Sequence, residues 1–190
     1  MINRSKLAGL LFISAAWGCY RPLPEIEPVQ PAPEADASYF SEHPLMVPVE
    51  SVPPRDLTDS FNAPRGNGRT HRAIDILAPR GTPVVAAIDG SVLRLAQSAA
   101  GGIAAYLVDD ARRYVYYYAH LERYADAVTE GLRVPKGFVI GYVGTSGNAP
   151  PGTPHLHFQV MRLADGQRDW WNGPPVDALR FMTETGRSSR

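Results

Sequence analysis

Two of the five histidines in this 190-residue chain, His155 and His157, stand two positions apart. Residues 153–160 read as a β-strand, and side chains alternate between the two faces of a strand, so both imidazoles point the same way. Imidazole is a common zinc ligand and the usual acid/base group near neutral pH. The pair therefore indicates a metal site or a general-base site, although a His-x-His pair on a half-buried strand also occurs as a plain structural feature.

A second polar pair, His71 and Asp75, lies four residues apart in another apolar stretch. A fully extended strand would hold these two side chains about 13 Å apart. Two ligands of one zinc ion lie within a few ångströms of each other, so a shared metal requires the chain to bend between them. Without a metal, such a pair most simply makes a surface hydrogen bond.

The segment Tyr114–Leu121 supplies a third group, His120. On a regular strand His120 shares a face with Tyr116 and Tyr118, whereas Tyr117 points to the opposite face. We expect Tyr116 and Tyr118 to line a groove for an extended polar substrate and Tyr117 to face the core. The alternative is that His120 is simply packed among tyrosines.

Together, His71, Asp75 and one histidine of the 155/157 pair make a set of two imidazoles and one carboxylate. Three protein ligands leave a tetrahedral zinc ion one open position, which is typical of a catalytic site. Such a centre can acidify a water molecule and polarise a carbonyl group. His120 and the other member of the pair are suitable proton carriers. The chain has no His-Glu-x-x-His sequence, so the glutamate base of helical zinc proteases is absent.

The elements that must position these residues read as short strands separated by glycine and proline turns. The expected strands are residues 73–77, 83–87, 90–95, 104–108, 114–120, 138–143 and 155–161. Only residues 125–131 suggest a turn of helix. We predict a mostly β domain over residues 57–190, with its core in 62–161, built as an antiparallel sheet or sandwich with a substrate groove.

The N-terminal third differs in composition. Residues 1–18 combine a basic start with a short apolar run, and the only cysteine, Cys19, follows. This pattern predicts a lipoprotein signal peptide with an acylated Cys19, or else an ordinary secretory signal. The proline-rich residues 19–56 predict a disordered linker. The formal net charge is zero, which argues against nucleic acid as a partner.

Several motifs carry a family resemblance from about Asn62 to Met161. They are His71-x-x-x-Asp75, the segment Ala78–Val84, the segment Asp89–Val92, the segment Tyr118–Leu121, Gly141-x-Val143-Gly144 and the segment His155–Phe158. In combination they resemble the lysostaphin-type (LytM-like) zinc peptidases. The chain departs from the common pattern at Gln159, where these peptidases often carry glutamate.

The resemblance implies that His71, Asp75 and His157 bind one zinc ion and that His120 and His155 are catalytic. It also implies a β-sheet groove and hydrolysis of peptide bonds in bacterial peptidoglycan by an exported enzyme of the cell envelope, which a lipid on Cys19 would hold at the membrane. The alternative is a non-catalytic peptidoglycan-binding module that activates another hydrolase. Relatives with that role commonly lack the metal ligands, which this sequence retains.

Overall fold

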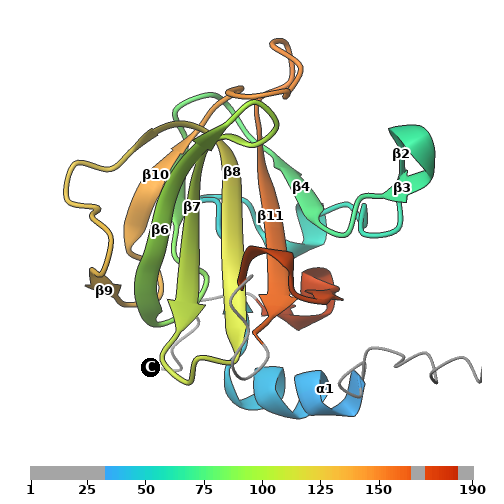
Figure 1. Ribbon diagram of the computed structural model, residues 1–190, viewed down its shortest axis with the longest axis vertical. Coiled ribbons are helices and arrows are strands. Elements are labelled where there is room, and N and C mark those ends of the chain that lie inside the picture. Colours follow the sequence, from blue (N-terminus) through green and yellow to red (C-terminus); the bar gives the residue numbers. More distant parts are fainter. Residues whose placement is uncertain (1–32, 164–169, 184–190) are drawn as a thin grey trace, which may run out of the picture.

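The centre of the molecule is an antiparallel sheet whose strands follow the order β12-β11-β8-β7-β6-β9 in the computed structural model, which describes residues 33–163 and 170–183 (Figure 1). Strand β4 pairs with β11 at one side, and β10 joins the far end of β8 to β5. Every pairing in this sheet is antiparallel, as the sequence predicted.

All seven strands expected from the sequence are present, with boundaries shifted by a few residues. They are β4 (Ile74–Leu77), β5 (Pro83–Val85), β6 (Gly90–Ser98), β7 (Gly102–Asp109), β8 (Tyr114–Tyr124), β10 (Val139–Val143) and β11 (His155–Arg162). The prediction of a helical turn at residues 125–131 is wrong, because that segment forms turns and an irregular connection. Val128 in this connection is buried against the core, so an isolated apolar residue there reflects packing of a loop.

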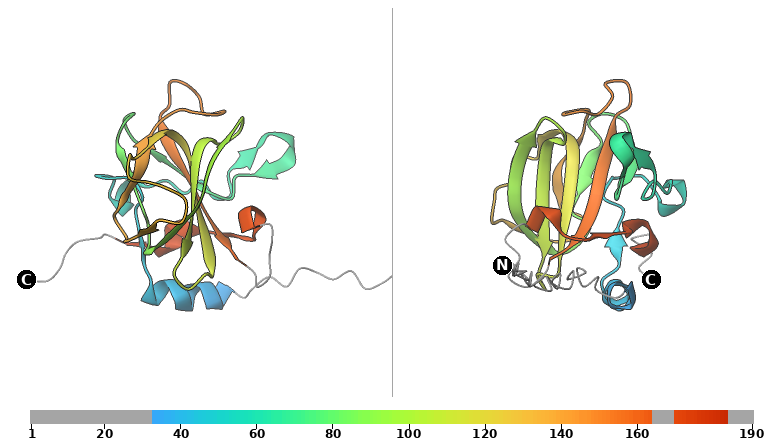
Figure 2. Two further views of the ribbon diagram at one scale, coloured as in Figure 1. Left: turned by 60° about the vertical axis from the view of Figure 1, so that its left-hand side comes forward. Right: turned by 45° about the vertical axis from the view of Figure 1, so that its right-hand side comes forward.

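Shorter elements complete the described chain. They are β2 (Pro64–Arg65), η2 (Gly66–Gly68), β3 (Arg69–Thr70), β9 (Arg133–Val134), η3 (Trp170–Asn172), β12 (Pro175–Val176), η4 (Ala178–Phe181) and β13 (Met182–Thr183). Strands β2 and β3 form a small hairpin that projects from the side of the domain near β4, as the views in Figure 2 also show. Trp170 packs edge-on against Tyr106 of the sheet.

Residues 33–56 belong to the folded domain, so the predicted boundary between linker and domain at residue 56 is wrong. This stretch contains α1 (Pro33–Glu42), β1 (Leu45–Met46) and η1 (Pro54–Asp56). Leu45, Val47 and Val49 alternate along the chain and are all buried in the core. The frequent prolines hid this period-two pattern. The other residues of the predicted linker, 19–32, lie outside the described residues.

Helix α1 lies at the lower end of the sheet (Figure 1), and a buried ion pair between Asp36 and Arg162 fastens it there. The Asp36 carboxylate accepts hydrogen bonds from the Arg162 guanidinium at the end of β11 and from the Tyr114 hydroxyl at the start of β8. Only 4% of Asp36 is exposed. Within residues 33–163 and 170–183, no helix is long and apolar enough to span a membrane.

Candidate metal centre and catalytic cleft

Strand β11 places both histidines of the 155/157 pair in one cleft near the upper end of the sheet. His157 lies opposite Asp75 of β4 on one side and opposite Ala119 of β8 on the other. The intervening Leu156 and the following Phe158 are fully buried on the opposite face. This alternation is the one that the sequence predicted, and it directs His155 and His157 toward the same cleft.

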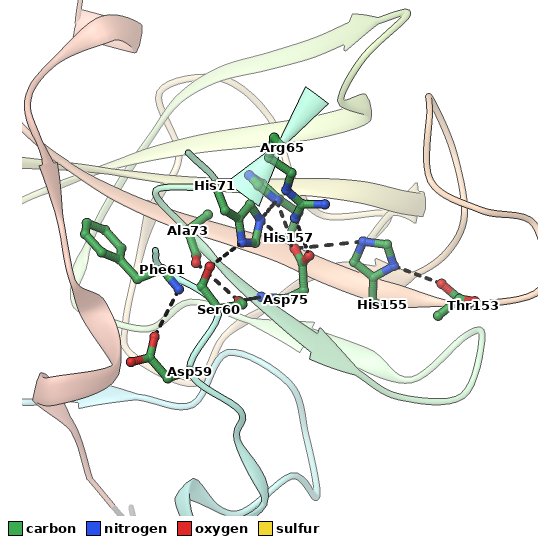
Figure 3. Close-up of polar contacts among 10 residues, drawn as sticks. All are labelled: Asp59, Ser60, Phe61, Arg65, His71, Ala73, Asp75, Thr153, His155 and His157. Carbon is green, nitrogen blue, oxygen red and sulfur yellow. Dashed lines mark hydrogen bonds and ion pairs between the residues drawn. The ribbon is translucent and has the colours of Figure 1, made fainter. Parts of the chain in front are cut away.

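A bend between β3 and β4 brings His71 next to Asp75. Arg72 adopts a positive φ of 61°, which reverses the chain direction locally and removes the long separation of an extended strand. Ser60 supports both ends of the bend (Figure 3): its carbonyl accepts a hydrogen bond from His71 Nδ1, and its hydroxyl accepts one from the Asp75 amide. The sequence predicted the bend, whereas nothing in it pointed to Ser60.

Three electron-rich atoms converge at this point. His71 Nε2, Asp75 Oδ1 and His157 Nδ1 lie 3.0 Å from one another in each of the three pairs. Because the Ser60 carbonyl can only accept, His71 carries its proton on Nδ1, and the Nε2 lone pair of the neutral ring faces the carboxylate. Without a metal ion His157 Nδ1 can donate a hydrogen bond to Asp75 Oδ1, and in its other tautomer it presents a third ligand atom at the same place.

The set fits zinc in both chemistry and spacing. Nitrogen and oxygen ligands about 2.0–2.1 Å from a tetrahedral zinc ion lie about 3.3–3.4 Å apart, close to the separations seen here. Among the described residues, these three form the one group of histidine, cysteine or acidic side chains that could share a metal ion. His71 would hold the ion through Nε2, Asp75 through Oδ1 and His157 through Nδ1.

The charge state of the site also suits a cation. Burial opposes ionisation of Asp75, but its contacts with His157, His71 and Arg65 outweigh burial and hold the pKa of the carboxyl below its ordinary value. Burial lowers the pKa of the His157 imidazole, against the opposing effect of Asp75. An ionised carboxylate beside neutral imidazoles is the protonation state that binds zinc.

His120 reaches the cleft because of a β-bulge. In the pairing of β7 with β8, Ile103 is opposite Leu121 and Ala105 is opposite Tyr118, so Ala119 and His120 together face the single residue Ala104. His120 has a positive φ of 62°, a strained conformation for a residue with a Cβ atom. The bulge moves His120 away from the face occupied by Tyr118 and into the cleft.

Both remaining histidines are held through their Nδ1 atoms. His120 Nδ1 lies 2.8 Å from the Ser146 carbonyl, and His155 Nδ1 lies 2.8 Å from the Thr153 carbonyl. Each Nδ1 must therefore carry the proton, which leaves each Nε2 as a proton acceptor. His155 Nε2 lies 3.9 Å from Asp75 Oδ1, and the His120 ring lies 4.9 Å from the His155 ring. Burial lowers the pKa of the His120 imidazole, which favours its neutral form.

The prediction that Tyr116 and Tyr118 line the groove is wrong. Both side chains are fully buried in the core, where the Tyr118 hydroxyl accepts a hydrogen bond from the Ala87 amide. Tyr117 instead lines the cleft, with its ring 6.0 Å from that of His157. The error followed from assigning Tyr116 and Tyr118 to the face of His120, and Tyr117 to the core, by strict alternation, because the bulge reverses that alternation between Tyr118 and His120.

The cleft around these groups has a volume of about 560 Å³. The hairpin β2–β3, the turn between β6 and β7, and the loop before β11 supply its walls. Its lining residues, besides the five histidine and aspartate groups, are Arg65, Arg69, Thr70, Leu77, Ala100, Gly101, Tyr117, Ala119, Asn148, Ala149, Pro150 and Thr153. Cys19 lies outside the described residues, so the predicted acylation has no structural counterpart here.

Comparison with known proteins places these residues in a recognised context. The model of Peptidase family M23 matches residues 69–177. The L-Ala–D-Glu endopeptidase of Bacillus subtilis is 37% identical over 120 residues, which are 60% of this chain and 36% of that protein. The peptidoglycan DD-endopeptidase ShyC of Vibrio cholerae is 34% identical over 112 residues, 56% of this chain and 25% of that protein. This chain thus spans about a third or less of each relative.

A solved structure shares the fold as well. The zinc-containing peptidase from Vibrio cholerae superimposes with a TM-score of 0.53 and 26% identity, covering 67% of this chain and 37% of that one. The match confirms the mostly β architecture that the sequence predicted.

Proposed function

Because this chain belongs to peptidase family M23, we propose that it is a zinc-dependent endopeptidase that hydrolyses peptide cross-links or stem peptides of bacterial peptidoglycan. One relative is named a peptidoglycan DD-endopeptidase and another an L-Ala–D-Glu endopeptidase, and a structural neighbour is described as a zinc-containing peptidase. The observation that carries the proposal is the convergence of His71 Nε2, Asp75 Oδ1 and His157 Nδ1 within 3.0 Å of one another beside two further histidines.

The three converging side chains would hold one zinc ion. When bound, zinc makes a water molecule acidic enough to attack near neutral pH and polarises the scissile carbonyl. With two neutral imidazoles and one carboxylate as ligands, the centre keeps a net positive charge. The role of the protein is to hold Asp75 ionised and to orient His71, through Ser60 and Arg65.

His120 and His155 would manage protons. Each ring is fixed by a hydrogen bond from Nδ1 to a backbone carbonyl, so Nε2 is the atom left to accept a proton from the attacking water. Once protonated, the same imidazole can donate to the developing oxyanion or to the leaving amine. Because His120 and His155 lie on neighbouring strands, one imidazole can accept a proton and the other can donate one in the same turnover without a large movement of either side chain.

Replacement of His120 tests the division of roles. His120→Ala should still bind zinc but release fragments from purified sacculi at least about 100-fold more slowly, the range of general acid–base catalysis. His43→Ala is the matched control, because His43 directly follows α1, stacks on Tyr39 and does not line the cleft. Digestion by His120→Ala at the wild-type rate would overturn the role of His120. The alternative, a non-catalytic activator of another hydrolase, predicts protein that purifies without zinc and digests nothing.

We further propose that the enzyme acts in the cell envelope, held to a membrane by a lipid on Cys19. Residues 20–32 would connect that anchor to α1, which lies at the end of the sheet away from the cleft (Figure 1). The cleft would then open away from the membrane, toward the wall. Cys19→Ser should shift the protein from the membrane fraction to the soluble fraction, and continued membrane association would contradict the anchor.

A further inference from the structure

The charged residues around the cleft are unequally distributed. Among the residues that the structure describes, Asp75 is the only acidic one that lines the cleft, whereas the hairpin β2–β3 contributes two arginines, Arg65 and Arg69. Arg65 is already engaged, since its guanidinium lies 2.6 Å from Asp75 Oδ2, the carboxylate oxygen turned away from the three converging atoms. Arg69 donates from Nε to the Gly66 carbonyl at 3.3 Å. No carboxylate of residues 33–163 or 170–183 lies within ion-pair distance of Arg69.

The two arginines form a cross-strand pair. In the hairpin register Arg65 is directly opposite Arg69, so their side chains share one face of a two-stranded ladder. Cβ atoms of such a pair lie about 4.5–5.5 Å apart, and like charges at these positions destabilise a hairpin. The short hairpin thus keeps two like charges opposite each other, and local departures of this kind from the rules of stability are expected at functional sites.

We propose that Arg65 and Arg69 form a subsite for a carboxylate of the substrate peptide. The proposal rests on the proposed function and specifies the substrate class: a peptide that carries a free carboxylate close to the scissile bond, as opposed to a neutral bridge such as oligoglycine. A guanidinium presents paired donors that match a carboxylate, and an incoming anion would relieve the repulsion between the two side chains.

The contact between Arg65 and Asp75 fixes where this carboxylate binds. Arg65 lies beside Asp75, one of the three converging residues (Figure 3). A group that bridges Arg65 and Arg69 would therefore lie on the hairpin side of the reacting carbonyl, beside the metal ligands. Arg69 is the cleaner residue to test, because it contacts no side chain of the metal centre, whereas any change at Arg65 also alters Asp75.

The experiment uses cross-linked stem-peptide fragments released from sacculi, either native or with their carboxylates converted to carboxamides. The ratio of kcat/KM for the native fragments to that for the amidated fragments measures the preference. We expect a ratio of about 10 to 100 for the wild-type protein, the range of a hydrogen-bonded charge pair. The ratio should fall to near 1 in Arg69→Gln and stay intermediate in Arg69→Lys. It should also fall as the salt concentration rises.

Arg112→Gln is the matched control. It removes the same charge from an exposed arginine in the turn between β7 and β8, at the opposite end of these strands from the cleft, and should keep the wild-type ratio. A wild-type ratio near 1, or a wild-type ratio retained in Arg69→Gln, would overturn the subsite.

Failure of the subsite and failure of the proposed function give different results. If the zinc-loaded wild-type protein cleaves neither fragment, the proposed function is wrong. The subsite is then judged by binding alone, from titration of both fragments into His120→Ala protein with and without Arg69→Gln. Tighter binding of the native fragments that disappears with Arg69→Gln supports the subsite, and equal binding of both fragments contradicts it.

Discussion

Two carboxylates at opposite ends of the sheet show how differently this fold uses a partly or fully buried acid. At the lower end, the Asp36 carboxylate accepts hydrogen bonds from the guanidinium of Arg162 and the hydroxyl of Tyr114, both of which are donors. At the cleft, Asp75 Oδ1 meets His71 Nε2 and His157 Nδ1, each 3.0 Å away. The first cluster is satisfied by the protein itself, whereas the second brings together three atoms that could share a metal ion.

The difference lies in the partners and not in the acid. A permanently charged arginine makes Asp36 a fastening for α1. Imidazoles whose other nitrogen is fixed by a backbone carbonyl, as His71 is by Ser60, present lone pairs and make Asp75 part of a binding site. The two acids therefore predict opposite consequences of mutation, one on stability and one on metal binding.

The largest effect should follow removal of Asp75. Asp75→Ala should lose its zinc and lower sacculus digestion by more than about 10⁴-fold, because zinc shifts the pKa of a bound water from 15.7 to about 7. In the presence of chelator, its free energy of unfolding should stay within about 1 kcal/mol of chelator-treated wild type, since the exposed contact to Arg65 contributes little. Elemental analysis and urea unfolding measure the two quantities. Retention of stoichiometric zinc would remove Asp75 from the ligand set.

Removal of Asp36 should give the reverse pattern. Asp36→Ala leaves the Arg162 guanidinium and the Tyr114 hydroxyl buried without their partner, and should lower the free energy of unfolding by about 3–5 kcal/mol. Below the unfolding transition the protein should still bind zinc. A variant with wild-type stability would show that α1 does not depend on this ion pair.

A smaller effect is expected at Ser60, which supports the metal ligands from outside. Ser60→Ala removes the hydroxyl that accepts the Asp75 amide hydrogen bond but keeps the carbonyl that orients His71. Zinc affinity should fall by roughly 10-fold, the lower end of the range for groups that support metal ligands. Competition with a chromophoric chelator measures it. An unchanged affinity would mean that the backbone alone positions Asp75.

Much of this arrangement could be predicted from the sequence because its signals are local. The strands are short and bounded by glycine and proline, and the alternation along residues 155–158 gives the direction of His155 and His157 directly. The bend between His71 and Asp75 followed from distance alone, and Arg72 provides it.

The rest depends on tertiary contacts without a local signal. The bulge at His120 arises from two-to-one pairing with β7, and strict alternation therefore assigned Tyr116 and Tyr118 to the wrong face. One of the two contacts that Ser60 makes to the metal ligands comes from its backbone carbonyl, which any residue could supply. The burial of residues 45–49 depends on the bridge from Val49 to Val84 and on the pairing of β1 with β13, far along the chain.

The central claim is that His71, Asp75 and His157 hold a single zinc ion, and native mass spectrometry of the purified protein tests it most directly. We expect one zinc ion per wild-type chain and none in Asp75→Ala. A folded wild-type protein that carries no metal after incubation with zinc, or that holds the same zinc without Asp75, would contradict it.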